Sequence, residues 1–213
     1  MRYRKTNPLN RGFKEKVIVD DLNNFLQSEH VITIITNKRI DGGSSLRRPD
    51  VLINCHDYSI IVEIDERQHR SYSTYSKEKN EQRMNDLISD LPGRKIVIIR
   101  FNPDSYKDAN RVVRKSLFSK TKKERIYQIG CPKKYEERMT VLKDLVVHYL
   151  SHAPEKALTE HKLYYDKFDV EQITLNNVET GLLIQQLKQL KNAESQPGRI
   201  VHVETTSDLY DFM

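Results

Sequence analysis

The stretch that decides the fold runs from Pro49 to His69 and reads PDVLINCHDYSIIVEIDERQH. Residues 51–55 and 59–64 are rich in β-branched side chains, and turn-forming residues lie between them. This pattern predicts two antiparallel strands joined by a hairpin, with His56 and Asp57 as a two-residue loop. The hairpin in turn fixes which side chains face one another across the two strands.

The expected hairpin brings several carboxylates together. A two-residue loop pairs Cys55 with Tyr58, and the same register places Asp50 opposite Glu63, with Cβ atoms roughly 5 Å apart on one face. Asp65 lies two residues past Glu63 and therefore shares that face. Carboxylates this close repel one another unless a proton or a cation lies between them, and such oxygen ligands suit Mg²⁺ or Mn²⁺. The sequence therefore predicts a metal site at Asp50, Glu63 and Asp65.

Each of these residues taken alone has a simpler interpretation. An Asp beside a turn, or a Glu at the end of a strand, is usually only solvated. Glu63 and Asp65, however, interrupt the apolar run formed by Ile60, Val62 and Ile64, where a polar side chain costs stability unless it is paired. The combination therefore favours one site over unrelated surface carboxylates.

The same residues carry a resemblance to a known family. Pro49-Asp50, followed by Glu63-x-Asp65 at the end of an apolar strand, resembles the PD-(D/E)xK nuclease superfamily. The longer string VEIDERQH at 62–69, then Arg83, then IRFNPD at 99–104, is similar to Vsr-like endonucleases and to nuclease-like proteins of large DNA viruses. The resemblance covers roughly residues 12–106. One departure is that Asp65 stands where the superfamily usually has Lys, so the role of that Lys does not carry over.

The resemblance implies a divalent-metal-dependent endonuclease that hydrolyses phosphodiester bonds of DNA. Asp50 and Glu63, with the Ile64 carbonyl as a third ligand, would hold Mg²⁺ or Mn²⁺ against the scissile phosphate. Asp65 would bind a second metal ion or orient His69. His69, four residues past Asp65, is then the expected proton carrier, and a polar anchor for its loop is the alternative role.

Further residues are candidates for supporting roles. Glu15 matches the glutamate that the superfamily often carries on its first helix, and a solvated carboxylate is the alternative. Arg47 and Arg48 end a loop beside the expected site, where they could hold a phosphate bidentately. The remaining accessory candidates are Glu66, Gln68, Arg83 and Arg100, and the two arginines would either contact phosphate or hold the carboxylates in place.

Composition bounds the class of protein. The 213 residues carry 36 Lys and Arg against 30 Asp and Glu, and the net charge of +6 fits an anionic partner without specifying nucleic acid. Two cysteines are too few for a disulfide framework and favour free thiols in a reducing compartment. No apolar run approaches the ~20 residues of a membrane span. We expect a soluble intracellular protein, in the cytoplasm, or in the nucleus of a host cell if the chain is viral.

Positive charge is concentrated between residues 107 and 138. Eleven Lys and Arg stand there against four Asp and Glu, an excess larger than the net charge of the whole chain, and Tyr127 and Tyr135 are interleaved with them. Such a segment suits a phosphate backbone and unpaired bases, whereas a solvated charged loop is the simpler interpretation. The residues predicted to bind nucleic acid are Lys120, Lys122, Lys123 and Arg125, together with Arg47 and Arg48.

The remaining elements are expected around the hairpin. Periodicity predicts a helix at 12–27, a strand at 31–36, a helix from Ser76 to about Asp90 and a central, covered strand at 95–101. The order αβββαβ within residues 1–118 is the one that the superfamily implies, an α/β restriction-endonuclease-like core. Residues 119–213 are expected to form a basic linker and a mixed α+β extension. Its predicted elements are helices at 132–150 and 178–192 and strands at 157–168 and 200–204.

Two other functions stay open at this point. A non-catalytic nucleic-acid-binding protein would keep the fold and the basic residues with a degraded nuclease site, and Asp65 in place of Lys favours it. A protein-interaction module of a viral replication or packaging machine would make the charge incidental. Salt-dependent DNA binding without cleavage indicates the former, and no binding indicates the latter. DNA or RNA, a branched or mismatched substrate, and the oligomeric state also stay open.

Overall fold

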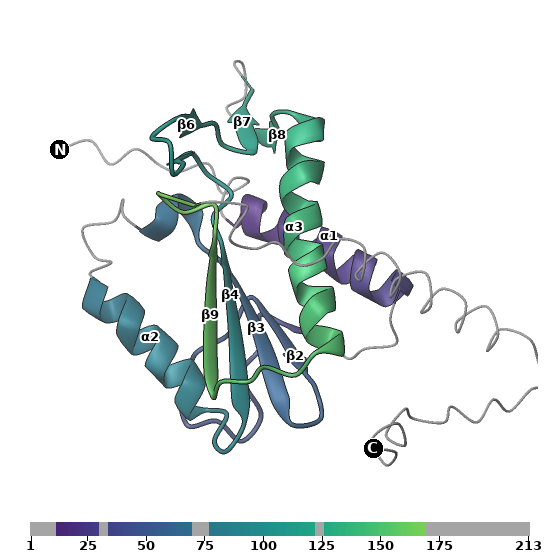
Figure 1. Ribbon diagram of the computed structural model, residues 1–213, viewed down its shortest axis with the longest axis vertical. Helices are drawn as coiled ribbons and strands as arrows, with labels where there is room; N and C mark the ends of the chain where they lie inside the picture. The colour runs from purple at the N-terminus through teal and green to yellow at the C-terminus, as the bar shows by residue number, and fades with distance from the viewer. Residues whose placement is uncertain (1–11, 30–33, 70–76, 122–125, 169–213) are drawn as a thin grey trace, which may run out of the picture.

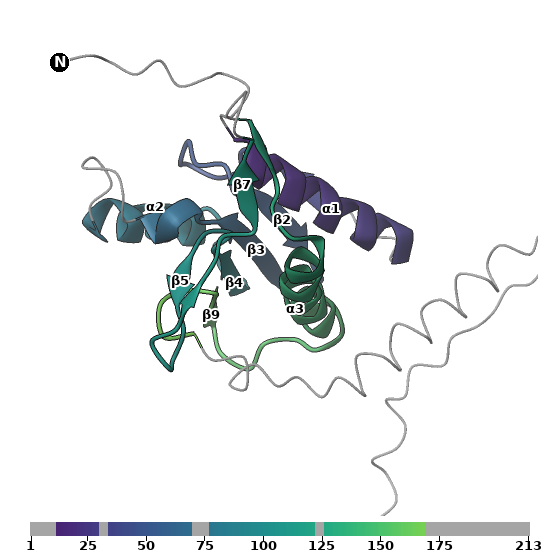
Figure 2. The ribbon, with the colours of Figure 1, turned by 90° about the horizontal axis from the view of Figure 1, so that it is seen from above.

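A five-stranded mixed sheet carries the fold in the computed structural model, which describes residues 12–29, 34–69, 77–121 and 126–168. The strands lie in the order β1-β2-β3-β4-β9, with helix α2 on one face and helices α1 and α3 on the other (Figure 1, Figure 2). The sheet consists of β1 (Ile34–Thr36), β2 (Val51–Asn54), β3 (Tyr58–Ile64), β4 (Lys95–Phe101) and β9 (Leu158–Leu163). The helices are α1 (Phe13–Glu29), α2 (Lys77–Ser89) and α3 (Pro132–Ser151). The chain is therefore a mixed α/β protein.

The central hairpin has the register that the sequence predicts. Val51 pairs with Val62 and Asn54 pairs with Ser59 in antiparallel β2 and β3. The amide of Cys55 donates to the carbonyl of Tyr58 at 3.0 Å, which closes the two-residue loop. Both strands are nearly fully buried because helices cover both faces of the sheet.

Helix α2 connects β3 to the parallel strand β4, and Figure 1 shows it lying alone on its face of the sheet. Its buried Met84 and Leu87, together with Leu91 just after the helix, pack with the buried Leu52, Ile61, Ile96 and Ile98 of the sheet. This spacing of three and four residues gives a helix one buried side. The central position predicted for residues 95–101 is confirmed, because β4 lies between β3 and β9.

The second half of the chain contributes to the same sheet and core. Strand β9 pairs in parallel with β4, and α3 places Met139, Leu142 and Val146 in the hydrophobic cluster that also contains Ile18 and Leu22 of α1. The helix predicted at 132–150 is present, and the strand predicted at 157–168 is present but ends at Leu163. Tyr164 has a positive φ of 61°, which bends the chain away from the ladder. Within the described residues, the boundary proposed at 118 thus separates two segments that share one sheet.

Two short hairpins lie over the end of the sheet where β3, β4 and β9 finish, at the top of Figure 1. They are β5 (Tyr106–Lys107) with β6 (Val113–Arg114), and β7 (Phe118–Lys120) with β8 (Tyr127–Ile129). The elements predicted at 178–192 and 200–204 lie outside the described residues, as do residues 31–33 of the first predicted strand.

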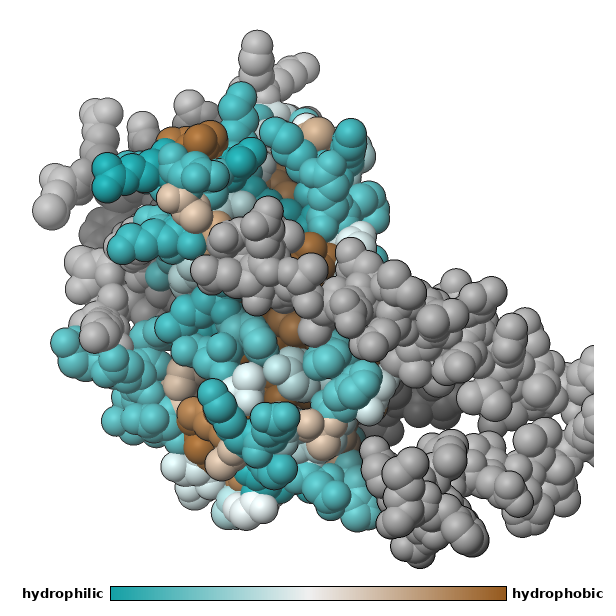
Figure 3. Space-filling view, in the orientation of Figure 1, coloured by the Kyte–Doolittle hydropathy of each residue, from teal (hydrophilic) through white to brown (hydrophobic). Residues whose placement is uncertain are grey.

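The visible surface is mostly hydrophilic, with apolar residues in small separate patches (Figure 3). None of the helices in the described ranges is long and apolar enough to cross a membrane.

Candidate functional site

Asp50 and Glu63 occupy adjacent strands at one end of the sheet. Asp50 directly precedes β2, and the register Val51 to Val62 carries on to place it opposite Glu63. The Asp50 Oδ2 atom accepts a hydrogen bond from the amide of Ile64 at 2.6 Å. Burial raises the pKa of Asp50 to about 8, and the nearby charges of Glu63 and Glu15 push it in the same direction. At neutral pH this carboxyl group therefore holds a proton unless a cation comes close.

Glu63 forms a two-pronged ion pair with Arg83. Both the Nε and the Nη2 of Arg83, on α2, donate to Glu63 Oε2, at 3.1 and 2.8 Å. The same Nη2 also donates to the carbonyl oxygen of Arg48 at 2.9 Å. Glu63 is only 3% exposed; burial raises its pKa and Arg83 opposes that rise. Burial thus disfavours the charged form of both carboxyl groups of the pair, and Arg83 offsets part of that effect at Glu63.

Glu15 approaches this pair from α1. Burial raises the pKa of Glu15, the charge of Glu66 adds to the rise, and Arg83 opposes it. Glu15 and Asp50 are also close enough for the charge of Glu15 to raise the pKa of Asp50. Three carboxylates, from α1, the start of β2 and the end of β3, thus share one region with Arg83 as their common cation.

Asp65 faces the same side of the sheet but has different partners. It is 1% exposed, and its Oδ2 is held by the guanidinium of Arg100 on β4 and by the hydroxyl of Tyr165 beyond β9. Arg100 also donates to Asn80 Oδ1 at 3.0 Å, so the network joins three strands to α2. Arg83 and Arg100, for which two roles were considered, hold carboxylates in this structure.

The chain after β3 forms a 3₁₀ turn at Glu66–His69. Gln68 has a positive φ of 52°, and its side-chain Nε2 donates to Asp166 at 3.0 Å. Gln68 therefore ties the turn to the segment beyond β9. The backbone of His69 lies in this turn, directly beyond the carboxylates, while its side chain lies outside the described residues.

Lys14 is a buried cation that the sequence analysis overlooked. It is 2% exposed, and its Nζ lies 2.7 Å from Asp104 Oδ1 and 3.2 Å from Glu66 Oε2. The ammonium also lies 4.6 Å from the ring centre of Tyr127. A signal existed, because Lys14 precedes the buried Ile18 by four residues and therefore lies on the buried stripe of α1.

The residues predicted to bind nucleic acid have varied surroundings. Arg47 Nε donates to Asp86 Oδ2 on α2 at 2.8 Å, while Arg48 is exposed. Lys120 is exposed beside the ring of Tyr127, and Lys122, Lys123 and Arg125 lie outside the described residues. Tyr135, expected among the aromatic residues that could meet bases, is 4% exposed and packs edge-on against Phe118 in the core.

The carboxylates at this end of the sheet have the donor atoms of a metal site but not its arrangement. No group of three or more His, Cys, Asp or Glu within residues 12–29, 34–69, 77–121 and 126–168 is arranged to hold a metal ion as it stands. The donor chemistry nevertheless suits a hard divalent cation, because Asp50, Glu63 and Glu15 supply carboxylate oxygens. Burial is the main cause of their raised pKa values and neighbouring carboxylates add to it, so a bound cation would lower them.

Sequence comparisons identify no relative of this chain. No protein-family model matches the chain, and neither does any curated protein.

Proposed function

We propose that this protein is a divalent-metal-dependent endonuclease of the PD-(D/E)xK type that acts on DNA. The observation that carries the proposal is the pair of half-buried Asp50 and buried Glu63 with Glu15 beside it, in which the pKa of Asp50 is raised to about 8. Strongly raised carboxyl pKa values in a cluster of this kind are typical of functional sites. The element order α1-β1-β2-β3-α2-β4 supports it, since it is the order that the resemblance implies.

Asp50 and Glu63 would hold Mg²⁺ or Mn²⁺, with Glu15 as an additional oxygen donor. The ion, when bound, supplies a water of lowered pKa and polarises a phosphoryl oxygen. Asp50 would act as a ligand in its ionised form, and the amide of Ile64 orients that carboxyl group. Arg83, which pairs with Glu63, would also be able to donate to a phosphate oxygen.

Asp65 has a positioning role in this proposal rather than the ligand role considered from sequence. Its contacts to Arg100 and Tyr165 fix the end of β3 against β4 and the segment beyond β9. This keeps the 3₁₀ turn at Glu66–His69 in place, and with it the backbone of His69. With no Lys at position 65, His69 is the proposed proton carrier because histidine is the side chain whose ordinary pKa lies closest to neutrality.

A second candidate function rests on the same Asp65. In the superfamily that the sequence resembles, a Lys stands at this position, and here a carboxylate bound by Arg100 and Tyr165 replaces it. A protein that binds nucleic acid through its basic segments without cleaving it is therefore the alternative.

Cleavage assays distinguish the two functions. We expect the purified protein to nick or cut DNA, offered as linear, mismatched and branched duplexes, in Mg²⁺ or Mn²⁺ and not in EDTA. Asp50→Asn should abolish cleavage and leave DNA binding unchanged or tighter, because it removes negative charge near the phosphate. Asp57→Asn, in the exposed hairpin loop, is the matched control and should cleave like wild type. Full Mg²⁺-dependent activity of Asp50→Asn would refute the assignment, and binding without cleavage by wild type would favour the second function.

A further inference from the structure

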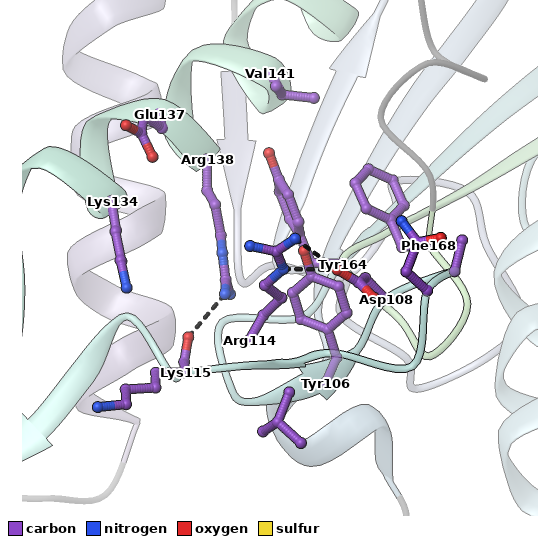
Figure 4. A pocket seen from close by; sticks show the side chains of 13 residues that line it. Tyr106, Asp108, Arg114, Lys115, Lys134, Glu137, Arg138, Val141, Tyr164 and Phe168 are labelled. Carbon is purple, nitrogen blue, oxygen red and sulfur yellow. Dashed lines mark hydrogen bonds and ion pairs between the residues drawn. The ribbon is translucent and has the colours of Figure 1, made fainter.

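A pocket of about 780 Å³ lies apart from the carboxylate region, on the α3 side of the sheet. Its walls come from three separate parts of the chain, as Figure 4 shows. The β5–β6 hairpin supplies Tyr106 and Arg114, helix α3 supplies Arg138, and the segment after β9 supplies Tyr164 and Phe168. The volume falls within the range of ordinary small-molecule sites.

The central feature of the pocket is a buried arginine without a carboxylate partner. Arg138 is 7% exposed, and its guanidinium lies 5.0 and 4.9 Å from the ring centres of Tyr106 and Tyr164. Nη2 donates to the carbonyl of Lys115 at 2.8 Å and Nη1 to that of Asp104 at 3.3 Å. Within the described part of the chain, no Asp or Glu forms an ion pair with it. Two carbonyl oxygens and two tyrosine rings thus hold the guanidinium at the pocket wall.

A second guanidinium lies close to the first. Arg114 reaches up from β6 toward the Arg138 side chain (Figure 4), and its charge lowers the pKa of Arg138 in addition to the larger effect of burial. Arg114 is paired with Asp108 Oδ2 at 2.6 Å. The residues that line the pocket include four cations and two carboxylates: Arg114, Lys115, Lys134 and Arg138 against Asp108 and Glu137. Two adjacent guanidiniums and an excess of positive charge suit an anion with several oxygens, such as a phosphate.

The rest of the lining is aromatic and aliphatic. Tyr106, Tyr164 and Phe168 pack against one another, with ring centres 4.6 to 6.2 Å apart. Arg138 already lies beside both tyrosine rings, so the aromatic group does not form an empty cage for a ligand cation. Val113, which is 62% exposed, and Val141 extend the apolar wall. One wall of the pocket is cationic and another is apolar and partly aromatic. Together they suit a ligand that has both a phosphate and a flat organic group.

We propose that this pocket binds a nucleotide unit, with Arg138 and Arg114 holding the phosphate and the apolar wall contacting the sugar and base. Tyr164 and Tyr165 are consecutive, and they contact the pocket and Asp65 respectively. A strand held in the pocket would therefore be fixed close to the end of the sheet that carries the carboxylates. The proposal goes beyond the nuclease function and does not depend on cleavage.

The test measures ligand binding in EDTA, so that no hydrolysis occurs. The probes are thymidine monophosphate, thymidine, inorganic phosphate, and a short single-stranded thymidine oligonucleotide with and without a 5′-phosphate. We expect the monophosphate to bind more tightly than thymidine or inorganic phosphate. Arg114→Gln and Arg138→Lys should weaken that binding about tenfold or more, since Gln removes the charge and Lys lacks the planar guanidinium that donates two parallel hydrogen bonds. Lys156→Gln, an exposed control at the opposite end of β9, should bind like wild type.

Every outcome bears on the proposal. Competition by the unphosphorylated oligonucleotide indicates an internal phosphate of a strand, and competition only by 5′-phosphorylated ligands indicates a strand end or free nucleotide. Wild-type affinity in Arg114→Gln, whose side chain is half exposed and tolerates substitution, overturns the proposal even if Arg138→Lys fails to fold. So does inorganic phosphate binding as tightly as the nucleotide.

The nuclease function and the nucleotide pocket can each be refuted without refuting the other. Normal nucleotide binding by the pocket variants, combined with loss of cleavage in Asp50→Asn, refutes only the pocket. Nucleotide binding that needs Arg114 and Arg138, combined with no cleavage by wild type in any metal, refutes only the nuclease function.

Discussion

At the scale of single residues, the main feature is the division of charge among buried carboxylates. Glu63 is paired with Arg83 and Asp65 with Arg100, whereas among the described residues the hydrogen-bond donor to Asp50 is the amide of Ile64. Removing a cation from a buried pair is strongly destabilising, so the two arginines are needed for stability whether or not they also serve catalysis. Because the pKa of Asp50 is raised to about 8, the charge of this group changes with pH near neutrality.

The raised pKa of Asp50 predicts how stability changes with pH. Because its folded-state pKa of about 8 lies above the ordinary value of 3.8, the stability it contributes is complete below about pH 4 and is lost as pH rises toward 8. Asp50→Asn keeps an acceptor for the Ile64 amide and has no charge to bury. In EDTA the free energy of unfolding of the variant, relative to that of wild type, should rise by about 2 kcal/mol between pH 5 and pH 7. Urea unfolding at both pH values measures this.

A control variant and added Mg²⁺ test the same prediction. Asp57→Asn, in the exposed loop, should show the same pH dependence as wild type. Added Mg²⁺ should stabilise wild type more than Asp50→Asn at pH 7, because a ligand of the folded state stabilises in proportion to its binding. Parallel stability curves for wild type and Asp50→Asn would contradict the assignment of the proton to Asp50.

His69 gives a second prediction at this scale, which rests on the proposed nuclease activity. If it carries a proton, His69→Ala should lower the rate by about 10²–10⁴ and remove one limb of the pH–rate profile, with metal affinity nearly unchanged. A metal ligand would instead give a loss that high Mn²⁺ rescues, and a loop anchor would give a lower Tm with a modest change in rate. Rates within a few-fold of wild type at every pH would exclude the catalytic role.

At the scale of elements, β9 decides how the second half of the chain is attached. It extends the sheet beside β4, with Phe101 opposite Leu163, and its C-terminal neighbours supply Tyr164 to the pocket and Tyr165 to Asp65. Helix α3 covers the same part of the sheet and supplies Arg138. The segment 126–168 is thus part of the platform on which both proposed sites are built.

This arrangement predicts that substitutions at the two ends of β9 have unequal effects on stability. Leu163 is fully buried at the end of the strand that meets the core, and Leu163→Ala should cost about 2–5 kcal/mol. Leu158→Ala is the control in the same strand, since Leu158 is 47% exposed, and it should cost much less. Chemical denaturation followed by circular dichroism measures both. Equally small losses would show that β9 is not packed into the core.

At the scale of the whole molecule, the net charge of +6 and the basic residues of segment 107–138 favour an anionic partner. Part of this charge is already neutralised in the fold, since Arg114 is paired with Asp108. Arg138 is buried in the pocket, whereas Lys120 is exposed on the β7–β8 hairpin. The basic segment therefore divides into cations held in the pocket and cations at the surface.

The cations of residues 120–125 should contribute affinity for DNA rather than chemistry. Replacing Lys120, Lys122, Lys123 and Arg125 together by Gln should weaken DNA binding and flatten the log–log dependence of affinity on salt by about one unit for each lost phosphate contact. The cleavage rate at saturating DNA should stay close to wild type. Binding measured from low to high salt gives the slope, and an unchanged slope would remove this segment from the DNA interface.

The sequence by itself determined the elements and the central register. Period-two and period-three-to-four patterns located α1, β2, β3, α2, β4 and α3, and the two-residue loop at His56 and Asp57 fixed the pairing of β2 with β3. Local rules suffice there, because the hairpin register follows from the loop length. That register alone placed Asp50 opposite Glu63.

Only the tertiary structure decided which cation meets which carboxylate. Arg83 reaches Glu63 from 20 residues away, Arg100 reaches Asp65 from 35, and Tyr165 reaches it from 100. Neither β9 beside β4 nor the pocket around Arg138 follows from local periodicity, because both require segments far apart in the chain to pack on the same end of one sheet. Such contacts depend on how the whole core closes, and a pattern read along one strand or one helix carries no information about them.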